Sequence, residues 1–189
     1  MKIQNIKTPE DLMLYLDKNI SYGVIDKNGN KFFDSNSDNF QKACFADWKT
    51  KPTKQILEDG VGHCYDQVEI EREWFTLKDY KIKTFWISAY QEEIENSGFS
   101  HTYLIYKDRN NWFVFEHSDY FNKGIHKFKT LREAVTWQAQ KHVSFAESQI
   151  KPKIKYSVCI KEFSKPPFNL NMEQYLNFIM TQKDYNVRL

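Results

Sequence analysis

The sequence predicts a single α+β domain in which a helix beginning at a cysteine packs against an antiparallel β-sheet. Three observations lead to this prediction. An amphipathic, helix-like segment starts at Cys64, directly after two glycines. Segments rich in β-branched and aromatic residues at 82–90, 101–106 and 112–117 read as strands, and the last two are close enough to form a hairpin. A chain of 189 residues with 41% hydrophobic residues can bury one core without metal or disulfide staples.

The first third of the chain contains short elements separated by turns. Thr8 is a suitable N-cap and Pro9 a suitable first residue for a helix at 9–18. The polar segment at 26–30 contains Asn28 and Gly29 and is typical of a turn. We expect further apolar or helical segments at 20–25, 31–33, 40–48 and 53–57, with a loop at 34–39 and a break at 51–53.

The segment that starts at Cys64 has the features of a nucleophile site. Gly60 and Gly62 permit a sharp entry, and apolar positions then recur with helical spacing to about Leu77. Cys64 therefore falls in the first turn of a helix, where unpaired backbone N–H groups and the helix dipole favour a negative sulfur. A free thiol with a pKa near ~8.5 is mostly protonated at neutral pH, so a nucleophilic cysteine also needs a histidine and a group that orients it.

The second half of the chain supplies the sheet. The hairpin strands are joined by the polar residues at 107–111, and the acidic segment before them reads as a loop. Thr130 caps a helix predicted at 131–142, and Asn171 caps a closing helix. The remaining expected elements are a strand at 82–90, a loop at 91–99, a half-buried strand at 153–163 and a closing helix at about 171–181; the whole chain, 1–189, is expected to be one domain with its core at about 10–163.

His101 opens the first hairpin strand and is the candidate base. If the turn is centred on Asp108 and Arg109, antiparallel pairing puts His101 opposite Glu116, and opposite residues point to the same face with Cβ atoms about 5 Å apart. The Glu116 carboxylate would then accept an imidazole N–H and leave the other nitrogen for Cys64. The alternatives for this position are His117 after a one-residue slip, and Ser118 or Asp119 after a longer turn.

These three segments together resemble the transglutaminase-like superfamily, which shares the papain-like cysteine protease fold. The resemblance is to small single-domain members of bacterial or phage type and covers about residues 10 to 120. Its acid is usually Asp, so Glu116 departs from the pattern. The matching pieces are Gly60-Val61-Gly62-His63-Cys64-Tyr65-Asp66, His101-Thr102-Tyr103-Leu104-Ile105-Tyr106 and Trp112-Phe113-Val114-Phe115-Glu116.

The resemblance implies a triad of Cys64, His101 and Glu116, and an oxyanion hole beside the sulfur. The backbone N–H of Cys64 is one expected donor. Tyr22 and Trp48 are candidates for a side-chain donor or for the cleft wall. We expect His63 at the rim of the cleft or exposed, because adjacent residues on a helix point about 100° apart.

The activity implied by these residues is thiol-dependent acyl transfer to water or to an amine. Water would make the protein a cysteine protease, amidase or deamidase, and an amine would make it a transglutaminase; the resemblance favours hydrolysis of a protein or peptide substrate. The alternative is a non-catalytic binding or inhibitor module on the same fold. The acidic segment at 91–95 either favours basic substrates or is a solvated loop. The sequence leaves the oligomeric state open.

Composition argues against other functional classes. Lys and Arg number 27 and Asp and Glu 25, interspersed along the chain, so no basic patch for nucleic acid is predicted. No run of 18 apolar residues predicts a membrane span, and no apolar leader follows Met1. Zinc-site spacings and phosphate-binding glycine loops are missing, so no metal or other cofactor is expected. Three widely spaced cysteines fit a reducing, cytoplasmic location better than a disulfide framework.

Overall fold

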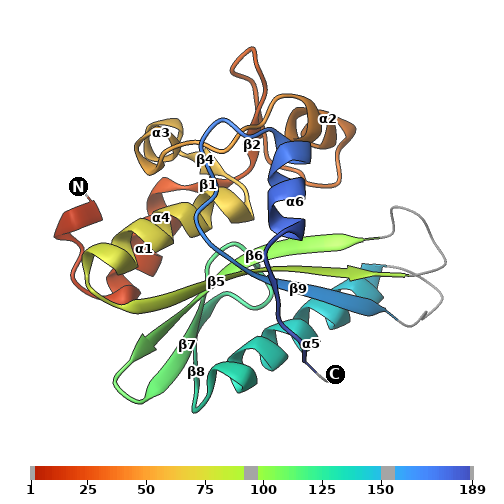
Figure 1. Ribbon diagram of the computed structural model, residues 1–189. Coiled ribbons are helices and arrows are strands. Elements are labelled where there is room, and N and C mark those ends of the chain that lie inside the picture. The colour runs from red at the N-terminus through yellow and green to blue at the C-terminus, as the bar shows by residue number, and fades with distance from the viewer. Residues whose placement is uncertain (1–2, 92–97, 150–155, 188–189) are drawn as a thin grey trace.

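A six-stranded antiparallel sheet divides the protein into two layers of helices. The computed structural model describes residues 3–91, 98–149 and 156–187 (Figure 1). The strand order in this sheet is β10-β9-β5-β6-β7-β8. Helix α4 crosses one face, together with α1 and α3, and helix α5 runs along the other (Figure 1). The fold is therefore α+β with a helix packed on an antiparallel sheet, as the sequence predicted.

The strands before α4 are two residues long each, and the six-stranded sheet is formed by strands that follow it. The helices are η1 (Ile3–Asn5), α1 (Pro9–Asn19), α2 (Asp38–Ala46), α3 (Thr53–Asp59), α4 (Cys64–Leu77), α5 (Leu131–Gln149) and α6 (Met172–Met180). The strands are β1 (Ser21–Tyr22), β2 (Val24–Ile25), β3 (Lys31–Phe32), β4 (Val61–Gly62), β5 (Lys81–Tyr90), β6 (Phe99–Asp108), β7 (Asn111–Glu116), β8 (Gly124–Phe128), β9 (Ser157–Phe163) and β10 (Lys183–Asp184).

Each face of the sheet buries its own core, because successive side chains of a strand point to opposite faces. On β6, Leu104 and Tyr106 pack with α1, α3 and α4. Tyr103 and Ile105 pack with α5 on the other face. A third cluster joins the start of α4 to α6 and strands β5 and β9, and includes Tyr65. Apolar packing therefore holds the start of α4 in place.

The two glycines before α4 have separate structural roles. Gly60 ends α3 with φ of 64°, a left-handed conformation that favours glycine. A Cβ atom at Gly62 would lie 2.6 Å from the Cβ atom of Asp66, so only glycine fits there. Strand β4 pairs in parallel with β1, which sets Tyr22 beside Gly62 at the entry to α4. The expected sharp entry into the cysteine-bearing helix is confirmed.

The predicted helix from Cys64 to Leu77 and the closing helix are confirmed, whereas other elements differ from the prediction. Helix α5 continues seven residues beyond the predicted end at 142, and strands β8 and β10 were not predicted. Most of the acidic segment at 91–95, and the start of the strand predicted at 153–163, lie outside the described residues. Within the described residues, none of the helices combines the length and apolarity needed to cross a bilayer.

Candidate active site

Cys64 is the first residue of α4, and its sulfur lies between two imidazoles. The thiol is within hydrogen-bonding reach of His101 on β6 and of His63, the residue that caps the helix. Burial alone would raise the pKa of Cys64, but hydrogen bonds and positive charge from the two imidazoles outweigh it and lower the pKa from 9.0 to about 5. A thiol with such a pKa is a thiolate at neutral pH.

His101 forms a short contact with Glu116. Its Nε2 atom is 2.7 Å from Oε2 of the carboxylate, and the His101 and Glu116 side chains are 11% and 1% exposed. Because Nε2 faces Glu116, the other ring nitrogen, Nδ1, is left for Cys64. Burial lowers the pKa of His101, but the Glu116 carboxylate and the thiol raise it well above its ordinary value. The three predicted residues Cys64, His101 and Glu116 therefore come together.

The predicted strand register was wrong by two residues. The turn is centred on Arg109 and Asn110, since Asp108 pairs with Asn111. Extending the Leu104–Phe115 pair by one residue puts Glu116 opposite Tyr103 and not opposite His101. A two-residue shift keeps every side chain on its face, so Glu116 reaches His101 along the diagonal between neighbouring strands.

Several donors hold the Glu116 carboxylate in its charged form. Oε1 accepts the backbone N–H groups of Ser118 (3.1 Å) and Asp119 (2.9 Å), and Oε2 accepts the side-chain N–H of Gln138 (3.0 Å). Burial raises the pKa of Glu116, and His101 together with these donors brings it below its ordinary value. Ser118 and Asp119, the alternatives to Glu116, instead donate hydrogen bonds to it, Ser118 through its backbone N–H and its hydroxyl and Asp119 through its backbone N–H. The Asp119 carboxylate accepts the N–H of Phe121.

His117, the remaining alternative, points away from His101. Its Nδ1 atom contacts Oε1 of Gln67 on α4, and its Nε2 atom is 2.8 Å from Oδ1 of Asp17 on α1. Burial and Lys123 lower the pKa of His117. Gln67 also donates to the carbonyl of Gly62, so this contact joins the end of β7 to the start of α4.

The expectation for His63 was wrong, because the residue is buried and not at an exposed rim. His63 is the N-cap, with an extended backbone (φ −81°, ψ −172°), so the 100° spacing of helical neighbours does not apply to it. Its side chain is 7% exposed and its Nδ1 atom accepts the N–H of Tyr65 at 3.2 Å. Burial lowers the pKa of His63, and Asp66 and the thiols of Cys44 and Cys64 raise it above its ordinary value.

Trp48 supports His63 and does not offer its own N–H to a ligand. The indole N–H donates to both Asp66 oxygens, at 3.3 and 3.1 Å, and the ring packs on His63 with centroids 4.6 Å apart. Asp66 in turn accepts the backbone N–H of His63. The indole N–H of Trp48 is therefore already bonded to Asp66, which corrects the expectation that Trp48 could be an oxyanion donor.

Tyr22 borders the sulfur from β1. Its ring stacks on Phe40 of α2 with centroids 6.1 Å apart, and 37% of the residue is exposed. Burial of the hydroxyl and the negative charge of Cys64 raise the pKa of Tyr22 well above its ordinary value. Tyr22 is thus a wall of the site that is open to solvent, as expected for a cleft residue. Cys44 is buried in an apolar cluster and also reaches His63.

Helix α5 supplies two site residues that the sequence analysis missed. Gln138 donates to Glu116, and one turn later His142 stacks on His101 with centroids 6.1 Å apart. His142 also contacts the carbonyl of Phe99 through Nε2, at 2.7 Å. Burial and the charge of His101 lower the pKa of His142 to about 4, so it stays neutral. The sequence pattern that could have identified them is two polar residues, four apart, on the apolar face of this helix.

Glu71 is a further buried acid near the site. It lies two turns after Cys64 on α4, it is 1% exposed, and its Oε2 atom has no hydrogen-bond partner among the described residues. Burial and the nearby Glu116 raise its pKa well above the ordinary value. Glu71 therefore keeps its proton to a higher pH than an exposed glutamic acid does.

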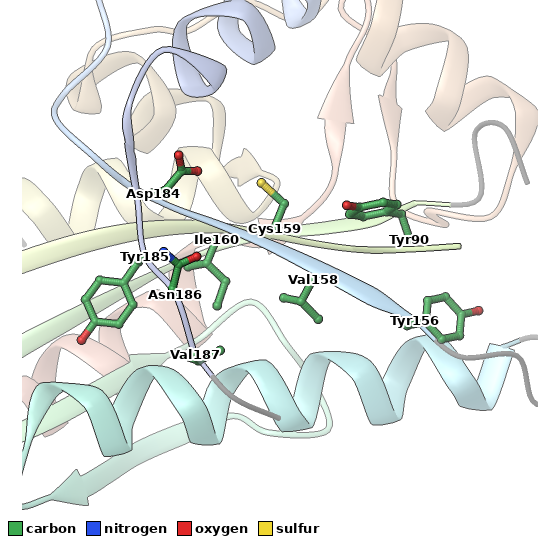
Figure 2. A pocket seen from close by; sticks show the side chains of 9 residues that line it. All are labelled: Tyr90, Tyr156, Val158, Cys159, Ile160, Asp184, Tyr185, Asn186 and Val187. Atoms are coloured by element: carbon green, nitrogen blue, oxygen red, sulfur yellow. The ribbon is translucent and has the colours of Figure 1, made fainter. Parts of the chain in front are cut away.

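A pocket of about 370 Å³ lies away from these residues, beside β9 and the C-terminal segment (Figure 2). Cys159 and Asp184 border it above the strand, and Val158 and Val187 lie toward α5 (Figure 2). Burial raises the pKa of Cys159, which disfavours its thiolate. Over the described ranges, no group of three or more His, Cys, Asp or Glu side chains is arranged to hold a metal ion.

Comparison with known proteins adds no assignment. No known family matches the chain, and no curated protein is similar to it.

Proposed function

We propose that the chain is a thiol-dependent acyl-transfer enzyme of the transglutaminase-like superfamily, with a papain-like core. The observation that carries the proposal is that a cysteine at a helix start lies within reach of an imidazole, which is itself held by a buried carboxylate. A structural cysteine needs neither partner. The superfamily assignment rests on the order of the three motifs along the chain and on the helix-on-sheet packing.

The proposed reaction begins with attack of the Cys64 thiolate on an amide or ester carbonyl. A C–S bond forms, and the carbonyl π electrons move to oxygen. When this intermediate collapses, the bond to the leaving group breaks and the leaving group takes the proton from Nδ1 of His101, while Glu116 steadies the positive ring through Nε2. Water then gives a proton to His101 and attacks the thioester, which releases the acid and restores the thiolate.

We propose hydrolysis as the main outcome, which makes the protein a cysteine protease, amidase or deamidase acting on a protein or peptide. Tyr22, beside the site, is 37% exposed and Cys64 is half-buried, so the site reaches the protein surface. Transfer to an amine, as in a transglutaminase, uses the same thioester. The three cysteines are free, which fits a proposed cytoplasmic location.

The test is acylation of the native protein with p-nitrophenyl acetate, with the labelled cysteine identified by peptide mass spectrometry. We expect the acetyl group on Cys64 and not on Cys44 or Cys159, and loss of the reaction in Cys64→Ala and His101→Ala. His126→Gln is the matched control, since His126 contacts the carbonyl of Asn122. Equal labelling of the three cysteines, or full reactivity in His101→Ala, would support a non-catalytic binding module instead.

The fate of the thioester distinguishes the subclasses. Adding methylamine to the acylated enzyme offers an amine that competes with water. Release of acetate at an unchanged rate supports a hydrolase, and release of N-methylacetamide in large excess over acetate supports a transglutaminase.

A further inference from the structure

His63 contains a buried N–H group without a partner, next to the proposed nucleophile. Its Nδ1 atom accepts the N–H of Tyr65, so the ring carries its hydrogen on Nε2. Nε2 is buried and has no partner with hydrogen-bond geometry among the described residues. Buried donors are nearly always paired, so this one needs an explanation.

The surroundings of His63 hold the ring in a fixed orientation. Trp48 packs on the ring, and the same Trp48 donates to Asp66, which accepts the backbone N–H of His63. The ring also lies within reach of the thiols of Cys44 and Cys64. A fixed N–H group at this place cannot turn away to another acceptor. In the resting site its neighbours are the thiols, and once the sulfur of Cys64 has bonded to a substrate, the carbonyl oxygen is a stronger acceptor than that sulfur.

We propose that Nε2–H of His63 is the side-chain donor of the oxyanion hole and acts together with the backbone N–H of Cys64. The inference rests on the proposed acyl-transfer function. When the C–S bond forms, the carbonyl oxygen becomes an oxyanion beside the start of α4. His63 donates a hydrogen bond to it and no proton is transferred, so the ring returns unchanged when the intermediate collapses. Preorganised donors of this kind stabilise the transition state more than the ground state.

The other two candidate donors fit less well. The indole N–H of Trp48 is already given to Asp66. Tyr22 is 37% exposed as a residue, whereas His63 is 5% exposed. His63 alone of the three combines burial with an unpaired donor.

Two substitutions separate the two roles of His63: capping α4 through Nδ1, and donating a hydrogen bond through Nε2. In His63→Asn, the amide oxygen can replace Nδ1 as acceptor of the Tyr65 N–H, because Asn is among the best N-caps, but nothing replaces Nε2. In His63→Gln, the longer amide reaches toward the Nε2 position and the cap is lost. Circular dichroism and thermal unfolding establish that each variant is folded.

The readout is a ratio of two rates at Cys64, each taken at its high-pH plateau, where the thiolate is fully formed. Acylation by p-nitrophenyl acetate creates an oxyanion, and alkylation by iodoacetamide does not. We expect the ratio of acylation to alkylation to fall about 100-fold in His63→Asn and less than about 10-fold in His63→Gln. A role limited to stabilising the thiolate would shift the pH profiles and leave the plateau ratio unchanged.

The outcomes also separate this inference from the proposed function. An unchanged ratio in His63→Asn, with wild-type Cys64 readily acylated, overturns the oxyanion role alone. If His63→Asn is unfolded, a ratio in His63→Gln that falls as far as about 100-fold overturns it as well. Wild-type Cys64 that alkylates but is never acylated overturns the proposed function, and this inference with it.

Discussion

The pH profile of Cys64 is the sharpest test of the electrostatics of the site. At pH 6, a thiol with the ordinary pKa of 9.0 is about 0.1% thiolate, and one with a pKa of about 5 is about 90% thiolate, a difference of about 900-fold. A less basic thiolate is also a weaker nucleophile. With a Brønsted coefficient near 0.45, a pKa that is four units lower reduces the rate constant of the thiolate by about 60-fold. Cys64 should therefore react about 15-fold faster than an ordinary thiol at pH 6, but only about 2-fold faster at pH 7.

The assay is thiol–disulfide exchange with 4,4′-dithiodipyridine between pH 4 and pH 10, with the modified cysteines identified by mass spectrometry. We expect the profile of Cys64 to rise with an inflection near pH 5. In His101→Ala the inflection should move to higher pH, because His101 gives the largest contribution that lowers this pKa. The plateau should rise at the same time, because the thiolate becomes more basic.

Cys159 and the variant His126→Gln provide the controls. Burial raises the pKa of Cys159, so its profile should rise above the range in which Cys64 titrates. His126→Gln should leave the profile of Cys64 unchanged. An inflection of wild-type Cys64 at pH 8 or above, or the same inflection in His101→Ala, would refute the reasoning.

Three further substitutions test the support of the site. Glu116→Gln removes the charge that raises the pKa of His101, so the acylation rate should fall and the imidazole should titrate at lower pH, measured by NMR; an unchanged imidazole pKa would contradict this. Gly62→Ala puts a Cβ atom 2.6 Å from Asp66 and should lower the free energy of unfolding by about 1 to 3 kcal/mol in urea titrations, whereas equal stability would show that the backbone moves aside. Glu71 keeps its proton in the folded state above pH 4.5 while the unfolded chain loses it, so stability should fall by about 1.4 kcal/mol per pH unit until the folded-state pKa is reached, and Glu71→Gln should remove that slope.

The strand that carries the acid shows why a wrong register can still give the right residue. The predicted turn was misplaced by one position, which moved the pairing of β6 and β7 by two residues. Strand side chains repeat with period two, so an even error preserves the face and an odd error does not. His117 was therefore the wrong neighbour under any even shift, and Glu116 kept its position on the face of His101.

The environment of His63 could not be predicted from the sequence by helix geometry. The rule that separates adjacent side chains by 100° holds for residues inside a helix, and His63 is its cap. A cap side chain folds back over the first turn, because it pairs with a backbone N–H there. Because the side chain of His63 folds back in this way, its imidazole ring lies beside Cys64. The prediction of His63 at the rim failed because a rule for residues inside a helix was applied to the residue that caps it.

The contribution of α5 was beyond sequence reasoning for a different reason. Gln138 lies 22 residues after Glu116, and only the packing of α5 on the sheet brings the two together. Their spacing along the chain carries no such information. The same holds for His142, which meets His101 across 41 positions of sequence.

The adjacent residues Glu116 and His117 connect the two halves of the proposed site. Because neighbouring strand residues point to opposite faces, Glu116 turns toward His101 and α5, and His117 turns toward α4. His117 contacts Gln67, which is three residues after Cys64 on that helix and is also bonded to Gly62. One end of β7 therefore fixes both the acid and the helix that carries the nucleophile. A displacement of β7 would move the carboxylate and the start of α4 together, so the distance between acid and thiol is set by this strand end rather than by the chain that runs between them through α4, β5 and β6.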